Sequence, residues 1–293
     1  MSDWSDYFYD SADGLRLYCR AFSAQQSGAL PVLCLHGLTR NSRDFVDLAT
    51  HLRARYEVLA ADQRGRGRSA WDPDPSRYEI ATYVRDMWSL LDARGVKRVI
   101  TIGTSLGALM SMVMMAQRAD RIAGAVLNDA GPELDPAGVR RIAGYTGKLP
   151  PVSNWAEAAT QTRSVYGSAL PGLSDWMEYA HRGYRENDAG IPVPDFDPRI
   201  AEAFKNPPKV TPDLWPLFAT LKTVPLLVIR GVLSDILSAA TVQRMAHEHP
   251  RLTHVTVANR GHAPLLDEPE AVSAIDAFLA RCAQSQSGRT HHG

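Results

Sequence analysis

Short apolar runs alternate with amphipathic segments along most of the chain. Two runs of alternating polarity, 7–10 and 15–22, flank Asp13-Gly14 and predict a β-hairpin. Short runs rich in Val, Ile and Leu predict strands buried on both faces, at 31–36, 56–62, 98–103, 124–129, 225–231 and 252–257. Helical periodicity lies between them, at 42–53, 80–94, 106–118, 239–249 and 270–282. This alternation predicts the α/β class, with a mostly parallel central sheet and helices on both faces.

The alternation breaks once, between residues 133 and 222. This segment has no convincing sheet strand and is rich in proline and aromatic residues. A loop of that length without structure is improbable inside a compact domain, so we expect an inserted, mainly helical cap. The predicted organisation is an α/β core in two parts (1–132 and 223–283), a cap (133–222) and a polar, disordered tail (284–293).

Charge and composition narrow the range of partners. The chain carries 32 Lys and Arg against 32 Asp and Glu, so its formal charge gives no electrostatic argument for nucleic acid or an anionic membrane. No apolar run approaches the roughly 20 residues that span a bilayer, and no secretory signal is visible. The three cysteines form no disulfide framework. We therefore expect a cytoplasmic protein whose partner is a small-molecule substrate; its oligomeric state stays open.

The first candidate for chemistry is Ser105, in Gly103-Thr104-Ser105-Leu106-Gly107. The pentapeptide follows an apolar strand and opens an apolar helix, which is the context in which G-x-S-x-G indicates a nucleophile. A tight turn between strand and helix holds such a serine in a strained conformation, and small residues two positions away avoid clashes. The helix N-terminus favours negative charge at this point.

A serine needs a base, and His262 is the expected one. It lies in Asn259-Arg260-Gly261-His262, after the last strand and before the last helix. That loop falls at the carboxyl edge of the sheet, where Ser105 also lies. For the acid that orients His262 we favour Asp235, because an acid after the penultimate strand is the commoner arrangement. Asp129, which also ends a strand, is the alternative.

Two loops complete the expected site. The backbone N–H of Leu38, in His36-Gly37-Leu38-Thr39, is expected to form an oxyanion hole with that of Leu106. His36 is interpreted as a structural residue that fixes this loop. The glycine-rich stretch 62–69 lacks the ending and spacing of a P-loop, so we interpret it as a tight structural turn.

Taken in order, these motifs resemble those of the α/β-hydrolase superfamily, over about residues 7–282. The resemblance is greatest to small bacterial capped esterases, lactonases and carbon–carbon bond hydrolases, and it implies a Ser105-Asp235-His262 triad with Leu38 and Leu106 at the oxyanion hole. Ala263 departs from the Trp that carbon–carbon bond hydrolases usually carry after the histidine. Haloalkane dehalogenases and epoxide hydrolases have aspartate where this chain has Ser105.

The predicted function is hydrolysis of a carboxylic ester or lactone through an acyl-enzyme, which needs no cofactor and no metal. The alternatives are carbon–carbon bond hydrolysis, a cofactor-free perhydrolase, and a ligand receptor that retains a hydrolase pocket. Candidate contacts to a partly apolar substrate are Arg40, Trp155, Trp176 and Tyr184.

Overall fold

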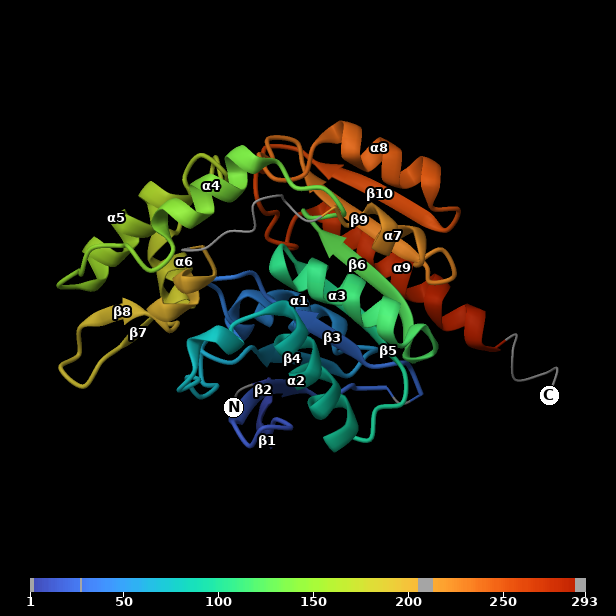
Figure 1. Ribbon diagram of the computed structural model, residues 1–293, viewed down its shortest axis with the longest axis horizontal. Coiled ribbons are helices and arrows are strands. Elements are labelled where there is room, and N and C mark those ends of the chain that lie inside the picture. Colours follow the sequence, from blue (N-terminus) through green and yellow to red (C-terminus); the bar gives the residue numbers. More distant parts are fainter. Residues whose placement is uncertain (1–2, 27, 205–212, 288–293) are drawn as a thin grey trace.

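An eight-stranded sheet forms the centre of the computed structural model, which describes residues 3–26, 28–204 and 213–287 (Figure 1). The strands are β1 (Ser5–Asp10), β2 (Arg16–Phe22), β3 (Val32–Leu35), β4 (Val58–Asp62), β5 (Val99–Thr104), β6 (Ile122–Asn128), β9 (Leu226–Gly231) and β10 (Leu252–Val257). Their spatial order is β1-β2-β4-β3-β5-β6-β9-β10. β1 and β2 pair antiparallel, β2 pairs antiparallel with β4, and all later pairs are parallel. The predicted mostly parallel sheet is confirmed.

Helices cover both faces of this sheet because successive strand residues point to opposite sides. In β3, Leu33 and Leu35 join one apolar cluster, whereas Val32 and Cys34 join the other. The first cluster receives side chains from α2 (Ile80–Ala93), α3 (Leu106–Gln117), α7 (Trp215–Ala219) and α8 (Ala239–Glu248). The second receives them from α1 (Val46–Leu52) and α9 (Pro269–Ser287). Four short 3₁₀ helices are also described: η1 (Ser42–Phe45), η2 (Pro75–Arg77), η3 (Ala119–Arg121) and η4 (Pro198–Phe204).

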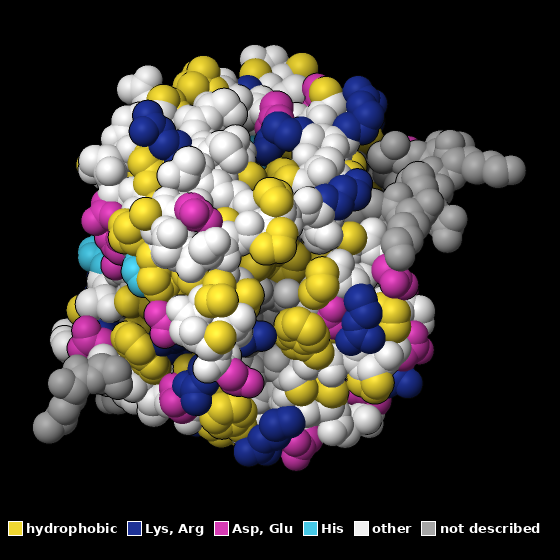
Figure 2. All heavy atoms as spheres, turned by 90° about the vertical axis from the view of Figure 1, so that its left-hand side faces the viewer, with side chains coloured by type: hydrophobic (Ala, Val, Ile, Leu, Met, Phe, Trp, Pro, Cys, Tyr) yellow, Lys and Arg dark blue, Asp and Glu magenta, His cyan; other side chains and the backbone are white. Residues whose placement is uncertain are grey.

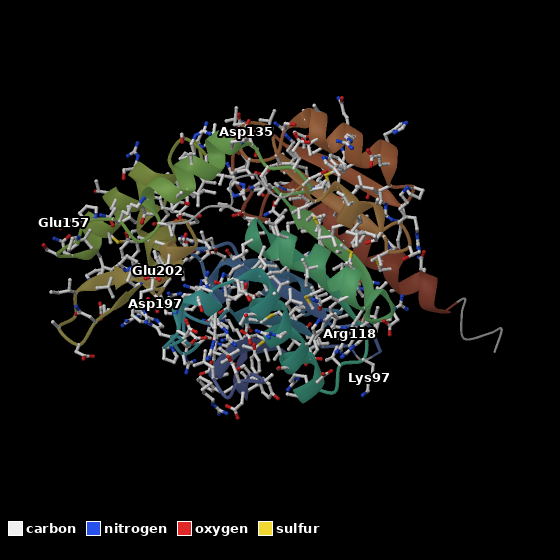
Figure 3. All side chains as sticks on the ribbon, in the orientation of Figure 1. Lys97, Arg118, Asp135, Glu157, Asp197 and Glu202 are labelled. Carbon is white, nitrogen blue, oxygen red and sulfur yellow. The ribbon has the colours of Figure 1, made fainter. Side chains whose placement is uncertain are left out.

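Most of the segment between β6 and β9 lies beside the sheet (Figure 1). It contains α4 (Pro136–Tyr145), α5 (Trp155–Tyr166), α6 (Trp176–Gly183) and a hairpin of β7 (Tyr184–Glu186) and β8 (Pro192–Pro194), which the sequence did not predict. Asp135, Asn154 and Asp175 start the three helices, each accepting a hydrogen bond from a backbone N–H of the first turn (Asp135 is labelled in Figure 3).

The C-terminal part of the segment between β6 and β9 packs against the core of the protein. In α7, the side chains of Trp215 and Phe218 belong to the main apolar cluster, together with methionines of α3. The boundaries proposed for a cap, 133 and 222, therefore stay a prediction.

At the C-terminus the helix is longer than expected. α9 continues past Cys282 to Ser287, so the expectation of a disordered tail is wrong for residues 284–287. Residues 288–293 lie outside the described residues. Within the part of the chain that the structure describes, no helix is both long and apolar enough to cross a membrane.

Candidate active site

Ser105 occupies the tight turn between β5 and α3. Its φ is +54°, a left-handed value that is strained for a residue with a side chain. Its N–H donates to the carbonyl of Asn128 at 2.9 Å, which ties the turn to the end of β6. A Cβ at Gly103 would lie 2.2 Å from the Gly107 oxygen, and one at Gly107 would lie 2.0 Å from the Leu35 oxygen. Both glycines are therefore required by the close approach of backbone, as the motif predicts.

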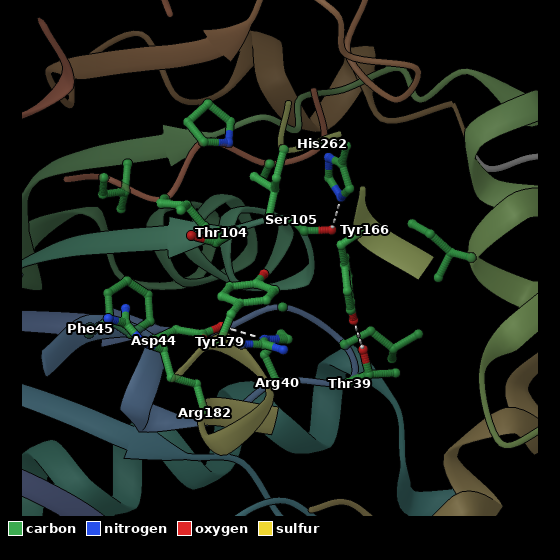
Figure 4. Close-up of a pocket in the computed structure, with 18 of the residues that line it drawn as sticks. Thr39, Arg40, Asp44, Phe45, Thr104, Ser105, Tyr166, Tyr179, Arg182 and His262 are labelled. Carbon is green, nitrogen blue, oxygen red and sulfur yellow. Dashed lines mark hydrogen bonds and ion pairs between the residues drawn. The ribbon is translucent and has the colours of Figure 1, made fainter. Parts of the chain in front are cut away.

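His262 and Asp129 complete a hydrogen-bonded series with this serine. His262 Nε2 is 2.8 Å from Ser105 Oγ, and its Nδ1 is 2.8 Å from Asp129 Oδ2 (the serine and histidine are shown in Figure 4). Because a carboxylate only accepts, Nδ1 must carry a proton, which leaves Nε2 of a neutral imidazole free to accept from the serine hydroxyl. Asp129 is fully buried and His262 is nearly so. The expected pairing of Ser105 with His262 is present.

The preference for Asp235 as the partner of His262 is wrong. Asp235 instead accepts two hydrogen bonds from Arg141 of α4, at 2.6 and 2.8 Å, and its side chain is 40% exposed. Arg141 also lowers the pKa of Asp235. Asp129 directly follows β6, next to β9 in the sheet, whereas Asp235 lies further along the loop after β9. The alternative acid, Asp129, is therefore the one that bonds to the histidine.

Two further donors hold the Asp129 carboxylate. The N–H of Gly231 donates to Oδ1 at 3.0 Å, and the hydroxyl of Ser234 donates to Oδ2 at 2.6 Å. Ser234 Oγ itself accepts from the N–H groups of Ile236 and Leu237 at 3.2 and 3.0 Å. These bonds hold the carboxylate toward His262. No motif in the sequence singles out Ser234 for this role.

The loop that carries Leu38 is fixed from two sides. His36 Nδ1 lies 2.7 Å from the Gly37 oxygen, and its Nε2 accepts from the N–H of Gln63 at 3.1 Å. Arg66, fully buried, donates from Nε to the Leu38 oxygen at 3.0 Å. A Cβ built on Gly37 would lie 3.7 Å from Ser105 Cβ, so the loop adjoins the serine. The structural role expected for His36 is confirmed; the oxyanion hole at Leu38 and Leu106 stays a prediction.

The tight turn expected at 62–69 is also present. Gly65 and Gly67 have φ values of +76° and +54°. The Asp62 carboxylate lies inside the turn and accepts from the N–H groups of Ser42 and Arg68 at 2.6 and 2.9 Å. A Cβ at Gly67 would lie 2.1 Å from Asp62 Oδ2, so the residue must be glycine.

Burial of His36 predicts a loss of stability in acid. Burial lowers the pKa of His36 to about 4 from a reference of 6.5. This histidine therefore binds a proton more tightly in the unfolded chain than in the folded one. The stabilisation that it provides above its unfolded pKa is lost as the pH falls toward its folded pKa. Between pH 7 and pH 5, we expect this histidine to lower the free energy of unfolding by about 2 kcal/mol. Urea unfolding of the parent and His36→Gln at both pH values checks this; equal pH dependence in both would contradict it.

A cavity of about 80 Å³ opens beside Ser105 and His262 (Figure 4). The charged residues that line it include Arg40, Asp44 and Arg182. The aromatic residues that line it include Tyr145, Tyr166 and Tyr179. The expected contact Arg40 therefore reaches the cavity. Its Nε donates to Asp44 Oδ2 at 2.8 Å, and its guanidinium carbon lies 4.4 Å from the Tyr179 ring centre.

The other three candidate contacts lie elsewhere. Trp155 packs against His181 with ring centres 3.7 Å apart and ring planes tilted by 32°, and it donates to Glu186 at 2.9 Å. Trp176 packs edge-on against Tyr179 and is not among the described residues that line the cavity. Tyr184 lines a separate, smaller cavity. Tyr145, Tyr166 and Tyr179 were not singled out, because packing between α4, α5 and α6 decides which aromatic side chains face the serine.

Comparison with known proteins agrees with this fold. The family model described as "Alpha/beta hydrolase family" matches residues 32–275, and the chain belongs to this family. A 3-hydroxybutyrate-oligomer hydrolase of Cupriavidus necator is 31% identical over 267 residues, covering 85% of this chain and 87% of that protein. A 2-(acetamidomethylene)succinate hydrolase of Mesorhizobium japonicum is 26% identical, covering 88% and 91%. The crystal structure of an α/β hydrolase from Novosphingobium aromaticivorans has a TM-score of 0.90 and 45% identity, covering 96% of this chain and 99% of that one.

Proposed function

We propose that this chain hydrolyses carboxylic esters through an acyl-enzyme formed on Ser105. The observation that carries the proposal is the series Ser105–His262–Asp129, with both hydrogen bonds at 2.8 Å and the serine on a strained turn beside a cavity. An activated serine needs a base in hydrogen-bond reach and a third group that orients the base, and these residues supply both.

In the proposed reaction, His262 Nε2 takes the hydroxyl proton while Ser105 Oγ attacks the ester carbonyl carbon. Asp129 stabilises the imidazolium that results. As the tetrahedral intermediate collapses, the carbon–oxygen bond to the alcohol breaks and His262 protonates the departing alcohol. A water then attacks the acyl carbon and gives a proton to His262. As the bond from that carbon to Ser105 Oγ breaks, His262 returns the proton to Oγ and the acid is released. Leu38 and Leu106 are the proposed N–H donors to the oxyanion in both steps.

For the substrate we propose an ester of a hydroxy acid, taken as short oligomers. The relative from Cupriavidus necator is named for 3-hydroxybutyrate oligomers and matches most of both chains. The cavity supports this class, because its wall combines tyrosine and arginine side chains with apolar Ile142, Leu170 and Leu265. A chain in which ester groups alternate with short aliphatic units presents both kinds of surface.

The test is a hydrolysis screen with linear 3-hydroxybutyrate oligomers, simple alkyl esters and lactones. We expect multiple turnovers on at least one ester and a burst of alcohol when deacylation is the slower step. The alternatives give different outcomes. A receptor would stop near one turnover, a perhydrolase would need peroxide for its main product, and a carbon–carbon bond hydrolase would leave every ester intact.

A further inference from the structure

A second, smaller cavity adjoins the one at Ser105. Its volume is about 20 Å³, and it lies between α5 and the β7–β8 hairpin, lined by Thr162, Val165, Tyr184 and Pro194 among others. The two cavities have four lining residues in common: Thr39, Arg40, Tyr145 and Tyr166. These four residues therefore border both cavities. Tyr166 and Thr39 meet at 3.3 Å between their oxygens, a long contact for two hydroxyls (Figure 4).

The second cavity in turn adjoins a surface groove of about 570 Å³. Leu149, Pro194 and Phe196 line both of them. The groove is mainly apolar, with Trp71 and Ile191 exposed by 43% and 37%. Large side chains of this kind are exposed at only a few places in the described chain. Hydrophobic side chains are gathered on the face shown in Figure 2, the side on which α5 and the hairpin lie.

We propose that these three spaces form one path for the acyl part of an elongated ester. Its carbonyl is held at Ser105, its chain passes Tyr166 into the second cavity, and its far end lies in the groove beside Trp71. The inference rests on the proposed ester hydrolysis and adds where a long substrate binds. The occupant is an uncharged linear chain, because the groove walls offer mostly apolar surface.

The position of His262 decides which half of the ester takes this path. The alcohol receives its proton from His262, so it must leave on the histidine side of Ser105. The loop from His262 to Leu266 lines the first cavity but not the second. The residues common to both come instead from the loop after β3 and from α4 and α5. The acyl half therefore points toward the second cavity.

One polar atom in the second cavity favours a chain with ester groups over a plain hydrocarbon. The hydroxyl of Thr162, a lining residue, is buried and lies close enough to the Tyr184 phenol to lower that group's pKa. A buried hydroxyl is costly when its hydrogen-bonding capacity is only partly satisfied. A carbonyl oxygen of a second ester unit would accept its proton.

The test blocks the path at Leu149, where the second cavity meets the groove. Leu149→Trp adds bulk there, and Lys148→Trp adds the same bulk at the adjacent exposed residue, which lines neither space. We measure kcat/KM for p-nitrophenyl esters from acetyl to decanoyl. In the parent each added methylene should raise kcat/KM about fourfold until the path is full. Leu149→Trp should lower decanoyl activity at least about tenfold and leave butyryl activity within about threefold.

Lys148→Trp should retain the parent profile. A Leu149→Trp profile equal to that of the parent would overturn the path. For the polar contact, Thr162→Val keeps the shape and removes the hydroxyl. It should weaken hydrolysis of a 3-hydroxybutyrate tetramer and spare decanoyl ester; equal effects on both would overturn this contact.

Binding separates this inference from the proposed function. Calorimetry with methyl decanoate on Ser105→Ala and on Ser105→Ala/Leu149→Trp measures the path without turnover. If no ester is hydrolysed by the parent, ester hydrolysis is wrong, and binding that weakens with Leu149→Trp would still support the path. Equal affinity in both variants would overturn the path even in an active esterase.

Discussion

Ser105→Ala should lower kcat/KM for esters by about 10⁴- to 10⁶-fold, because the nucleophile and its base act as a unit. The serine hydroxyl is the atom that meets His262 Nε2, and alanine leaves no group in its place. The backbone turn should persist, since Gly103 and Gly107 still permit the close contacts around it. The measurement is steady-state hydrolysis of a short p-nitrophenyl ester, with the melting temperature alongside.

Ser111→Ala is the matched control for this change. Ser111 lies on the same helix, α3, and its hydroxyl donates to the Gly107 oxygen at 3.0 Å. The substitution removes one buried hydroxyl without touching His262, so activity should stay within about threefold of the parent. An organophosphate should label the parent and Ser111→Ala, and leave Ser105→Ala unlabelled. Activity of Ser105→Ala within tenfold of the parent would contradict the assignment.

The parts of the site that could be predicted are those determined by residues close together in the sequence. The glycines at 103 and 107 and the strand before them place Ser105, and the loop after β10 places His262 at the same sheet edge. Both inferences need only a parallel sheet, whose strands end on one side. His36 could be assigned for the same reason, since it directly follows β3 and lies beside the turn that it fixes.

The acid could not be settled because two neighbouring strands each supply an aspartate. Asp129 and Asp235 follow β6 and β9, which pair in parallel, so sheet topology alone brings both to the same region. Contacts with other segments distinguish them. Arg141 of α4 donates hydrogen bonds to Asp235, whereas Ser234 and Gly231 donate to Asp129. The cavity wall depends on similar contacts. Tyr166 and Tyr179 line the cavity beside the serine, whereas Trp155 packs against His181, and no periodicity distinguishes these rings.

The two aspartates make a sharp test of the acid. In Asp129→Asn the amide can turn its NH₂ toward His262 Nδ1, which then carries no proton. The proton would lie on Nε2, which could no longer accept from Ser105. We expect kcat to fall by about 10⁴-fold, with organophosphate labelling of Ser105 slowed in parallel. Asp129 is fully buried, so the melting temperature of the variant should be measured to show that it remains folded.

Asp235→Asn is the matched control, because it makes the same chemical change after the neighbouring strand. It weakens a partly exposed pair with Arg141, for which the cost in unfolding free energy is about 1 kcal/mol or less. We expect kcat within about threefold of the parent and a slightly lower melting temperature. If Asp235→Asn were the more damaging change in kcat while both variants remained folded, the hydrogen bond from His262 to Asp129 would not be the one that orients the base. The expected ratio between the two variants, about 10³ or more, far exceeds what weakening the contact between Asp235 and Arg141 could produce.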